Sequence, residues 1–430
     1  MSLSRRGFFG LVGSGSQASG LAALIASRGH EAVMAQAQGA TQTGRAAGAG
    51  TQQGGGRGQG AGGRGGAGAQ GGRAARPGPP PGIDEIKISS NENPLGPGQH
   101  VLDAIMGKFP EAGRYPFNST PSDVKLAEGL AAMNKAKPEN IVLGAGSQEI
   151  LKTAMLAFTS PYRHLVTASP TFENCTGIAR RLGHGLREVK VDSQFKLDLE
   201  GMLTVARGAG LIFVNNPNNP TATVHGAKTI NDFVERVRRI SPDTVILIDE
   251  AYHDYVTDPE YQTAVPLALA TPNVFVARTF SKAYGMAGMR IGYAVGQPDT
   301  IKPLARLKMP YNISVFGIAA GLAAIGNSQH LTAERARNTE VRTFTTKFFE
   351  EMGCKSAVSN GNFIFVDIGR PAADFRSACA DAWVNVGRDF PPFEHSHARI
   401  SLGTMAEMKR ATEVFRNVLR PAAPAAGGGR

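Results

Sequence analysis

Short apolar runs alternate with amphipathic stretches along the middle of the chain. Each run ends abruptly at polar, glycine or proline residues, which is the pattern of buried strands separated by helices. The predicted strands are IVLGAG at 141–146, HLVTASPTF at 164–172, LREVKVD at 186–192, LIFVNNPNNPT at 211–221, VILIDEAY at 245–252, NVFVA at 273–277 and MRIGYAVG at 289–296. Ser147 is expected to cap the helix that follows the first of them. The alternation predicts a mostly parallel sheet with helices on both faces.

The pattern changes after residue 301. Helical spacing covers 299–308, 314–327, 330–352, 371–382 and the residues from Thr404, and apolar strands are predicted at 362–368, 384–389 and 397–403. Antiparallel strands among helices are typical of a smaller α+β domain. We therefore expect an α/β protein with an N-terminal arm over 83–114, a large domain over 115–300 and a small C-terminal domain over 301–430.

The N-terminal residues carry an export pattern. Arg5 and Arg6 precede a mild apolar stretch from Leu11 to Ile25, and the small residues Ala35 and Ala37 follow it. This order predicts a twin-arginine signal over 1–37, recognised by the twin-arginine export machinery, and hence a periplasmic protein. Glycine and serine interrupt the apolar stretch, so no stable membrane span is expected. The alternative is a disordered tail with a coincidental arginine pair, in a cytoplasmic protein.

Composition separates the next segment from the folded chain. Residues 38–82 contain no acidic, aromatic or large aliphatic residue, which predicts a disordered linker. Residues 1–82 hold eight arginines and one glutamate, or +7 of the net charge of +11, which leaves about +4 for the remainder. That remainder gives no reason to expect nucleic acid. Three scattered cysteines predict neither a disulfide framework nor a metal site.

Polar residues follow the predicted strands where a parallel sheet binds its ligands, beyond the carboxyl ends. Lys282 lies on the turn between two apolar runs, and we expect it to be buried. Burial lowers the pKa of an ammonium and frees the amine for carbonyl chemistry. Thr279, Ser281 and Arg290 offer two hydroxyls and a cation beside it. A phosphate held next to such an amine is what a pyridoxal phosphate Schiff base requires.

Several motifs occur together in the order known from one family. They are NENPLGP, RYPF, GAGSQE, SPTF, NNPNNPT, IDEAYHDY, RTFSKAYGMAGMRIGY and ARISLGT. On these motifs the chain resembles the fold-type-I pyridoxal phosphate aminotransferases (class I/II) over about residues 83–420, and most of all their histidinol-phosphate aminotransferase branch. The resemblance implies transfer of an amino group from an amino acid, or a histidinol phosphate-like amine, to a 2-oxo acid by a ping-pong mechanism.

The resemblance also implies roles around the cofactor. Lys282 would form the Schiff base and move the proton at the substrate's α-carbon, and Asp249 would pair with the ring nitrogen. Asn219 and Tyr252 would hydrogen-bond the phenolic oxygen, and Phe172 would stack on the ring. The residues implied to hold the phosphate are Gly146, Ser147, Gln148, Thr279, Ser281 and Arg290.

Further roles concern the substrate and the assembly. Arg399 would bind the substrate's carboxylate or phosphate, Arg388 its distal group, and Asn93 would also lie in the substrate site. Tyr115 resembles the tyrosine that reaches the phosphate of the neighbouring subunit, which implies a homodimer with shared sites.

The chain also departs from the family pattern. Ala222 stands where the family has glycine, and KMPYN at 308–312 stands where the branch has an arginine and PFN. An export signal is unusual for a histidine-biosynthesis enzyme. Two alternatives therefore stay open: another reaction on the same cofactor, such as decarboxylation, C–S lysis or racemisation, and an anion-binding protein that acts through its Gly/Arg tail.

Overall fold

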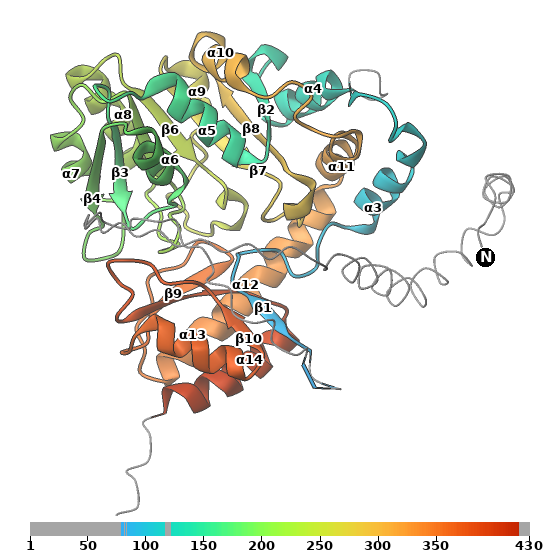
Figure 1. The fold of residues 1–430 in the computed structure, drawn as a ribbon, viewed down its shortest axis with the longest axis vertical. Helices are drawn as coiled ribbons and strands as arrows, with labels where there is room; N and C mark the ends of the chain where they lie inside the picture. The colour runs from blue at the N-terminus through green and yellow to red at the C-terminus, as the bar shows by residue number, and fades with distance from the viewer. Residues whose placement is uncertain (1–78, 81, 83, 117–121, 421–430) are drawn as a thin grey trace, which may run out of the picture. The chain divides into compact units, whose positions relative to one another are not determined.

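The computed structural model describes residues 79–80, 82, 84–116 and 122–420. The predicted export signal lies wholly outside these residues, and the predicted linker lies outside them except at its last few positions, so both remain predictions. Within this range the chain forms a large seven-stranded sheet with helices around it and a smaller group of strands and helices, most of it from residue 328 onward (Figure 1).

The large sheet has the predicted strands in a mostly parallel arrangement. In spatial order they are β2 (Ile141–Ala145), β8 (Ile291–Gly296), β7 (Val274–Thr279), β6 (Val245–Asp249), β5 (Leu211–Asn215), β3 (Leu165–Ser169) and β4 (Leu186–Lys190). Only β8 runs antiparallel to its neighbours, pairing with β2 and β7. The carboxyl ends of the other six strands therefore share one edge of the sheet.

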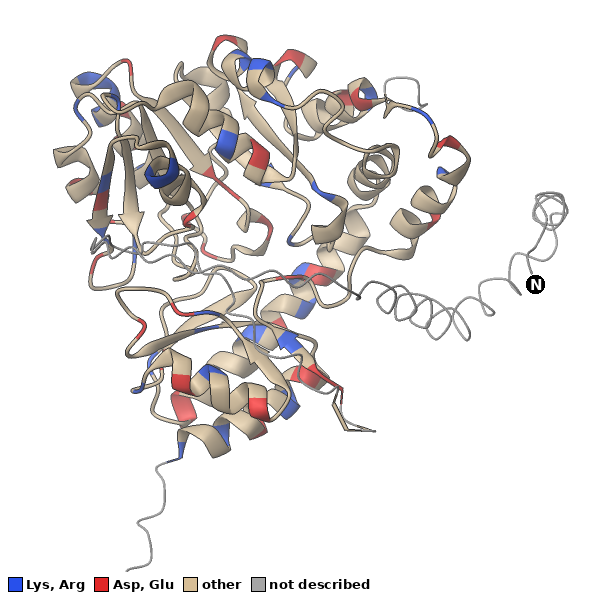
Figure 2. Ribbon diagram, viewed as in Figure 1, with Lys and Arg blue, Asp and Glu red and all other residues tan. Residues whose placement is uncertain are grey.

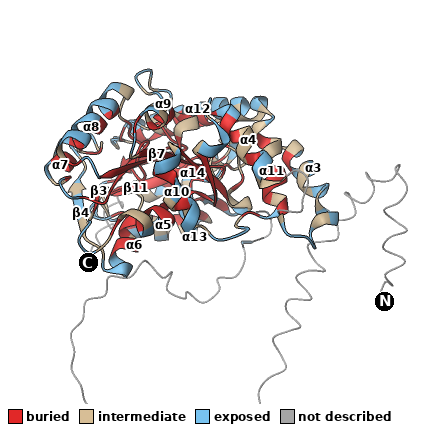
Figure 3. Ribbon diagram, turned by 90° about the horizontal axis from the view of Figure 1, so that it is seen from above, coloured by how far each residue is buried: buried red, intermediate tan, exposed pale blue. Residues whose placement is uncertain are grey.

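Alternate residues of these strands point to opposite faces, and each face has its own core. Ile246 and Ile248 of β6 belong to one core, and Val245 and Leu247 belong to the other. On the first face lie α4 (Asp123–Met133), α7 (Leu199–Thr204), α8 (Ala227–Ile240), α9 (Val265–Ala270) and α11 (Val315–Ile325). On the second lie α5 (Ser147–Phe158), α6 (Asn174–Leu182) and α10 (Pro298–Leu307). The fold class predicted from the sequence is confirmed: buried strands form the interior and exposed residues line the outer faces of the helices (Figure 3).

The smaller lobe has a third core. Its elements are β1 (Ile86–Ile88), α12 (Ser328–Glu351), β9 (Phe363–Asp367), α13 (Ala372–Asp381), β10 (Val384–Val386), β11 (His397–Ser401) and α14 (Met405–Leu419). β9 and β11 pair antiparallel as expected, but β10 pairs parallel to β1, which comes from the segment before the large sheet. The expectation of antiparallel strands was therefore wrong for β10.

Two local features differ from expectation. A helix that the sequence analysis did not predict, α3 (Gln99–Met106), packs against α11 and buries only Val101. Ser147 is the first residue of α5, not its cap; Gly146 holds the cap position with φ of 74°. Gly146 adopts this conformation without the strain that a Cβ would bring.

Charges of both signs are scattered over the helices (Figure 2), in keeping with the small net charge computed for the folded part. Across the part of the chain that the structure describes, no helix is long and apolar enough to cross a membrane. Nor do the described residues contain a cluster of three or more potential metal ligands from His, Cys, Asp and Glu.

Candidate active site

The turn from β2 into α5 forms a cradle for an anion. The N–H groups at the start of α5 have no partners within the helix, and the helix dipole is positive there. A Cβ on Gly146 would overlap the Arg290 guanidinium, so glycine allows this close approach. Arg290 donates to the Ser281 hydroxyl at 3.2 Å, and Thr279 donates to the same hydroxyl at 2.9 Å. Backbone donors, two hydroxyls and a cation suit a phosphate group.

Two other residues predicted for the phosphate lie in the same turn. Ser147 is buried, whereas Gln148, the next residue of α5, is exposed. Gly292 of β8 faces this turn closely, since a Cβ there would overlap the backbone of Gly146 and Ser147. The two glycines thus bring β8 and the α5 N-terminus together.

Asp249 ends β6 and is buried, with 2% of its surface exposed. Its Oδ1 accepts the Ala251 N–H at 3.1 Å. Burial raises the pKa of Asp249 to about 7, and the charge of Glu250 adds to the rise, while the Ala251 N–H and the Lys282 ammonium oppose it. A buried carboxyl with so little stabilisation suits a cationic partner such as a protonated ring nitrogen.

Lys282 lies on the turn between β7 and β8, as expected, but it is half-buried, not buried. Its Nζ donates to the Ser90 carbonyl at 3.1 Å and lies 5.5 Å from the centre of the Tyr252 ring. The Tyr252 hydroxyl accepts hydrogen bonds from Asn219 Nδ2 at 3.3 Å and from Asn91 Nδ2 at 3.1 Å. The lysine, the tyrosine and the asparagine predicted for the cofactor are thus neighbours.

Arg399 extends this group toward the smaller lobe. It is 7% exposed, and it donates to Asn219 Oδ1 at 2.9 Å and to the Ser89 carbonyl at 2.5 Å. Its Nε is buried without a hydrogen-bond partner. Burial lowers the pKa of Arg399 to about 10, and Arg388 contributes to the fall, while Tyr252 and Glu173 oppose it. A buried guanidinium with a free donor suits a carboxylate or phosphate ligand.

The remaining predicted residues lie around this centre. Phe172, after β3, is half-buried against the core of the second face. Arg388 forms an exposed ion pair with Glu173, at 2.7 Å between Nη2 and Oε2, and packs over the Phe390 ring. Asn93 donates to the Ala283 carbonyl at 3.0 Å, beside Lys282. Tyr115 is 64% exposed and packs on Tyr311, with the ring centres 5.3 Å apart.

Comparison with known proteins agrees with this arrangement. The model of the aminotransferase class I and II family matches residues 83–415. The chain belongs to this family. It is similar to a histidinol-phosphate aminotransferase of Moorella thermoacetica, with 35% identity over 78% of this chain and 85% of that protein. The family, the transaminase activity and the pyridoxal phosphate cofactor expected from the sequence are thereby confirmed.

Solved structures of similar proteins agree with the fold. One is a putative histidinol-phosphate aminotransferase from Erwinia carotovora atroseptica, with 32% identity, a TM-score of 0.74 and coverage of 77% of this chain and 95% of that one. Another is the histidinol-phosphate aminotransferase of Sinorhizobium meliloti in complex with pyridoxal-5'-phosphate. It has 27% identity, a TM-score of 0.71 and coverage of 78% and 91%.

The structure of this aminotransferase adds residues that the sequence analysis did not select. Asn91, in the same motif as Asn93, is the one that reaches Tyr252. Glu173 was missed because its ion pair with Arg388 joins residues 215 positions apart. Nothing in the sequence indicates that Glu173 and Arg388 pair. For Asn91, its place in the NENPLGP motif could have indicated a role in the site.

Glu149 was also missed. Its carboxylate accepts the N–H groups of Ala145 at 2.6 Å and Met309 at 2.9 Å, and the side-chain amide of Asn312 at 2.6 Å. Burial would raise the pKa of Glu149, but these hydrogen bonds hold it below its ordinary value. The glutamate therefore ties the phosphate cradle to the KMPYN loop, the segment that departs from the family pattern.

Proposed function

We propose that this aminotransferase moves the amino group of an amino acid, or of a histidinol phosphate-like amine, to a 2-oxo acid through Lys282. The observation that carries the proposal is a continuous chain of contacts from Arg399 through Asn219 to the Tyr252 hydroxyl, with the Lys282 amine 5.5 Å from the centre of the Tyr252 ring. Arg399, which can bind a substrate anion, and the amine of Lys282 are thus connected by direct hydrogen bonds and packing.

The residues present fit pyridoxal phosphate, because the cradle at the α5 N-terminus suits its phosphate and buried Asp249 suits its ring nitrogen. When bound, pyridoxal phosphate supplies a ring that takes up the electron pair released when a bond at the substrate's α-carbon breaks. Asp249 would hold a proton at the ring nitrogen. Asn219 and Tyr252 would donate to the phenolic oxygen, and Phe172 would pack on the ring face.

Lys282 acts on the substrate's α-carbon. Its Nζ would take the α-proton as a general base and hold that proton for its return, a role worth about 10²–10⁴-fold in rate. Arg399 orients the substrate by its anionic group, so that the α-proton lies within reach of Nζ. The partner anion is the α-carboxylate of an amino acid or the phosphate of histidinol phosphate.

A half-reaction experiment tests this function. Protein loaded with pyridoxal phosphate is mixed with one amino donor and no acceptor, using histidinol phosphate and a panel of amino acids in turn. A transaminase converts the bound cofactor to its amine form once and stops, and a 2-oxo acid then restores the starting absorbance. Repeated turnover of the donor without an acceptor would instead identify a decarboxylase or a lyase.

Lys282→Ala is the control variant for this experiment. We expect it to bind pyridoxal phosphate noncovalently, because the phosphate and ring contacts come from other residues, and to lose turnover by at least ~10³-fold. Multiple turnover in this variant would remove Lys282 from the mechanism.

The assembly is proposed to be a homodimer. Leu102 and Met106 of α3, Phe109, Met309 and Tyr311 are exposed apolar residues, and all lie on segments around α11. A group of exposed apolar side chains of this kind is typical of a subunit interface. The Tyr115 ring, packed on Tyr311, lies in the same region, which supports its proposed role in a neighbouring subunit's site.

Export is proposed from the sequence of residues 1–37 alone. The twin-arginine route carries folded cargo, and an enzyme with a bound cofactor must fold before transport, so signal and cofactor agree. The test is to fractionate cells expressing the native gene and a version with Arg5 and Arg6 changed to lysine. The native protein is expected in the periplasm, cleaved near Ala37; full-length protein confined to the cytoplasm would overturn the proposal.

A further inference from the structure

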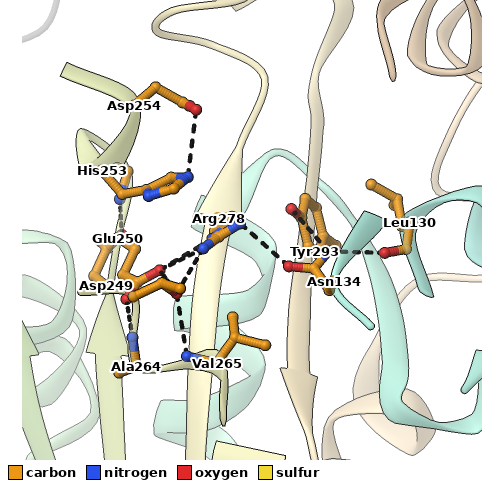
Figure 4. A network of polar contacts seen from close by, with 12 residues as sticks. Leu130, Asn134, Asp249, Glu250, His253, Asp254, Ala264, Val265, Arg278 and Tyr293 are labelled. Carbon is orange, nitrogen blue, oxygen red and sulfur yellow. Dashed lines mark hydrogen bonds and ion pairs between the residues drawn. The ribbon is translucent and has the colours of Figure 1, made fainter. Parts of the chain in front are cut away.

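A buried ion pair joins Glu250, the residue after Asp249, to Arg278 (Figure 4). Glu250 follows Asp249 at the end of β6 and is 2% exposed. Its Oε2 accepts from Arg278 Nε at 3.0 Å and from Arg278 Nη2 at 2.8 Å. Arg278 belongs to β7 and lies four residues before Lys282.

The ion pair lies just beyond the last paired residues of β6 and β7. Asp249 and Ala277 are the last register partners of β6 and β7, and the Glu250 N–H donates to the Ala277 carbonyl at 2.9 Å. The side chains of Glu250 and Arg278 join one step beyond that point. The strand end that bears Asp249 and the strand end that leads to Lys282 are therefore fixed to each other.

Each partner has further bonds that define its position. Glu250 also accepts from the Thr263 hydroxyl at 2.8 Å and the Ala264 N–H at 2.6 Å, just before α9. Arg278 donates to Asn134 Oδ1 at 3.2 Å, at the end of α4. A buried charge with this many partners has one geometry, and loss of its counter-ion leaves an uncompensated charge in a dry interior.

The charge of Glu250 acts on the neighbouring Asp249 carboxyl. Asp249 interacts electrostatically with Glu250, the next residue of the chain, with Lys282 from the turn after β7, and with the Cys175 thiol from α6. Two carboxylates on successive residues oppose each other's ionisation, and Arg278 offsets one of them. Arg278 does not touch the reacting atoms in this arrangement; it acts through Glu250.

We propose that Arg278 is a positioning residue of the reaction: its ion pair with Glu250 holds the ends of β6 and β7 together and offsets the Glu250 charge beside Asp249, and so governs how readily Asp249 takes up a proton. The inference rests on the proposed role of Asp249 at the ring nitrogen. It adds Glu250 and Arg278 to the residues that control protonation of the cofactor's ring nitrogen through Asp249.

The proposal predicts that two substitutions shift the pKa of Asp249 in opposite directions. The protein is labelled with ¹³C at the aspartate carboxyl carbons, and the Asp249 signal is assigned in the apoprotein by its loss in Asp249→Asn. In Glu250→Gln the Arg278 cation is left unpaired, so the pKa of Asp249 should fall. In Arg278→Met, Glu250 keeps its hydrogen bonds from Thr263 and Ala264 but loses its cation, so the pKa of Asp249 should rise. Each shift should reach about one pH unit, a tenfold change in proton affinity.

The double variant Arg278→Met/Glu250→Gln removes both charges and should return the titration to within about half a unit of the native value. A purely structural role predicts loss of stability in both single variants with shifts of one sign or none, and that result would overturn the proposal. Arg278→Lys is a conservative variant that should fold, because it keeps the positive charge, and it should leave the pKa of Asp249 unchanged. Lysine cannot form the two-point contact with Glu250, so this variant should lower kcat more than it changes KM.

A matched control is the exposed pair of Arg239 and Glu235 on α8, at 2.6 Å. Arg239→Met and Glu235→Gln make the same chemical changes away from the site and should leave the titration of Asp249 unchanged. The affinity for pyridoxal phosphate separates the two proposals: if Asp249→Asn binds the cofactor and turns over normally, the role of Asp249 fails, whatever the titration shows. If Asp249 is required but the two shifts do not oppose each other, the role of Arg278 fails.

Discussion

At the scale of single residues, Asp249 gives the apoprotein a characteristic pH dependence. Burial raises its pKa from 3.8 to about 7, so the native state holds the proton after the unfolded chain has released it. The resulting stability is complete below about pH 4 and is lost as the pH rises through about 7, at up to about 1.4 kcal/mol per pH unit. Denaturant unfolding of the native protein and Asp249→Asn should show this as a difference between their pH profiles. Parallel profiles would mean that Asp249 titrates normally.

The two arginines should differ in what they contribute to substrate binding. Arg399 is buried and has an unpartnered Nε, so Arg399→Ala should raise KM for amino acids by at least about 10²-fold, the loss of a charge-assisted pair in a dry site. Arg388 is exposed and already paired with Glu173, so Arg388→Ala should change KM by less than about tenfold. A KM insensitive to Arg399→Ala would place the substrate anion elsewhere.

Glu173→Gln serves as the companion variant for the second arginine. It releases Arg388 from its ion pair, so dicarboxylic substrates should gain affinity while monocarboxylic ones do not. An equal effect on both classes would show that Arg388 does not contact the distal group.

At the scale of elements, the geometry of the turn before α5 predicts that substitution of Gly146 weakens cofactor binding. Gly146→Ala adds strain at φ of 74° and an overlap with Arg290, so it should weaken pyridoxal phosphate binding by at least about tenfold. Gly353 has φ of 77° with open space around its Cβ position, which makes Gly353→Ala a matched control. Both variants should lose about 1 kcal/mol of stability, and only the first should lose cofactor affinity. Equal affinity in the two variants would remove the cradle from cofactor binding.

The elements also show what the sequence could and could not predict. Buried strands such as LIFVN and VILID have uninterrupted apolar patterns, so their order along the sequence is enough to predict that Asn219, Asp249 and Lys282 lie at one edge of the sheet. The α3 helix escaped prediction because it is short, lies between Pro/Gly segments and buries only Val101. The pairing of Glu250 with Arg278 depends on strand register, and periodicity carries no information about register between distant segments.

At the scale of the whole molecule, the exposed apolar residues around α11 predict the state of assembly. Met106 is 64% exposed, and a charge there would hardly affect a monomer. In a dimer that buries it, Met106→Glu should shift the protein to monomers in sedimentation velocity and reduce activity. Val358 is 76% exposed in the smaller lobe, and Val358→Glu should leave the assembly intact. A dimer that tolerates Met106→Glu would require an interface elsewhere.

Shared active sites can be tested by mixing two inactive proteins. In a dimer of Lys282→Ala and Tyr115→Ala subunits, the site that keeps Lys282 receives Tyr115 from its neighbour, if the tyrosine serves the other subunit. Such a site is native, so after subunit exchange the mixture should recover up to about a quarter of the native activity, since half of the dimers are mixed and each has one complete site. If Tyr115 serves its own subunit, no dimer contains a complete site and the mixture stays inactive. Recovery would therefore establish both the dimer and the direction in which Tyr115 reaches, because neither parent protein can supply the missing group to itself.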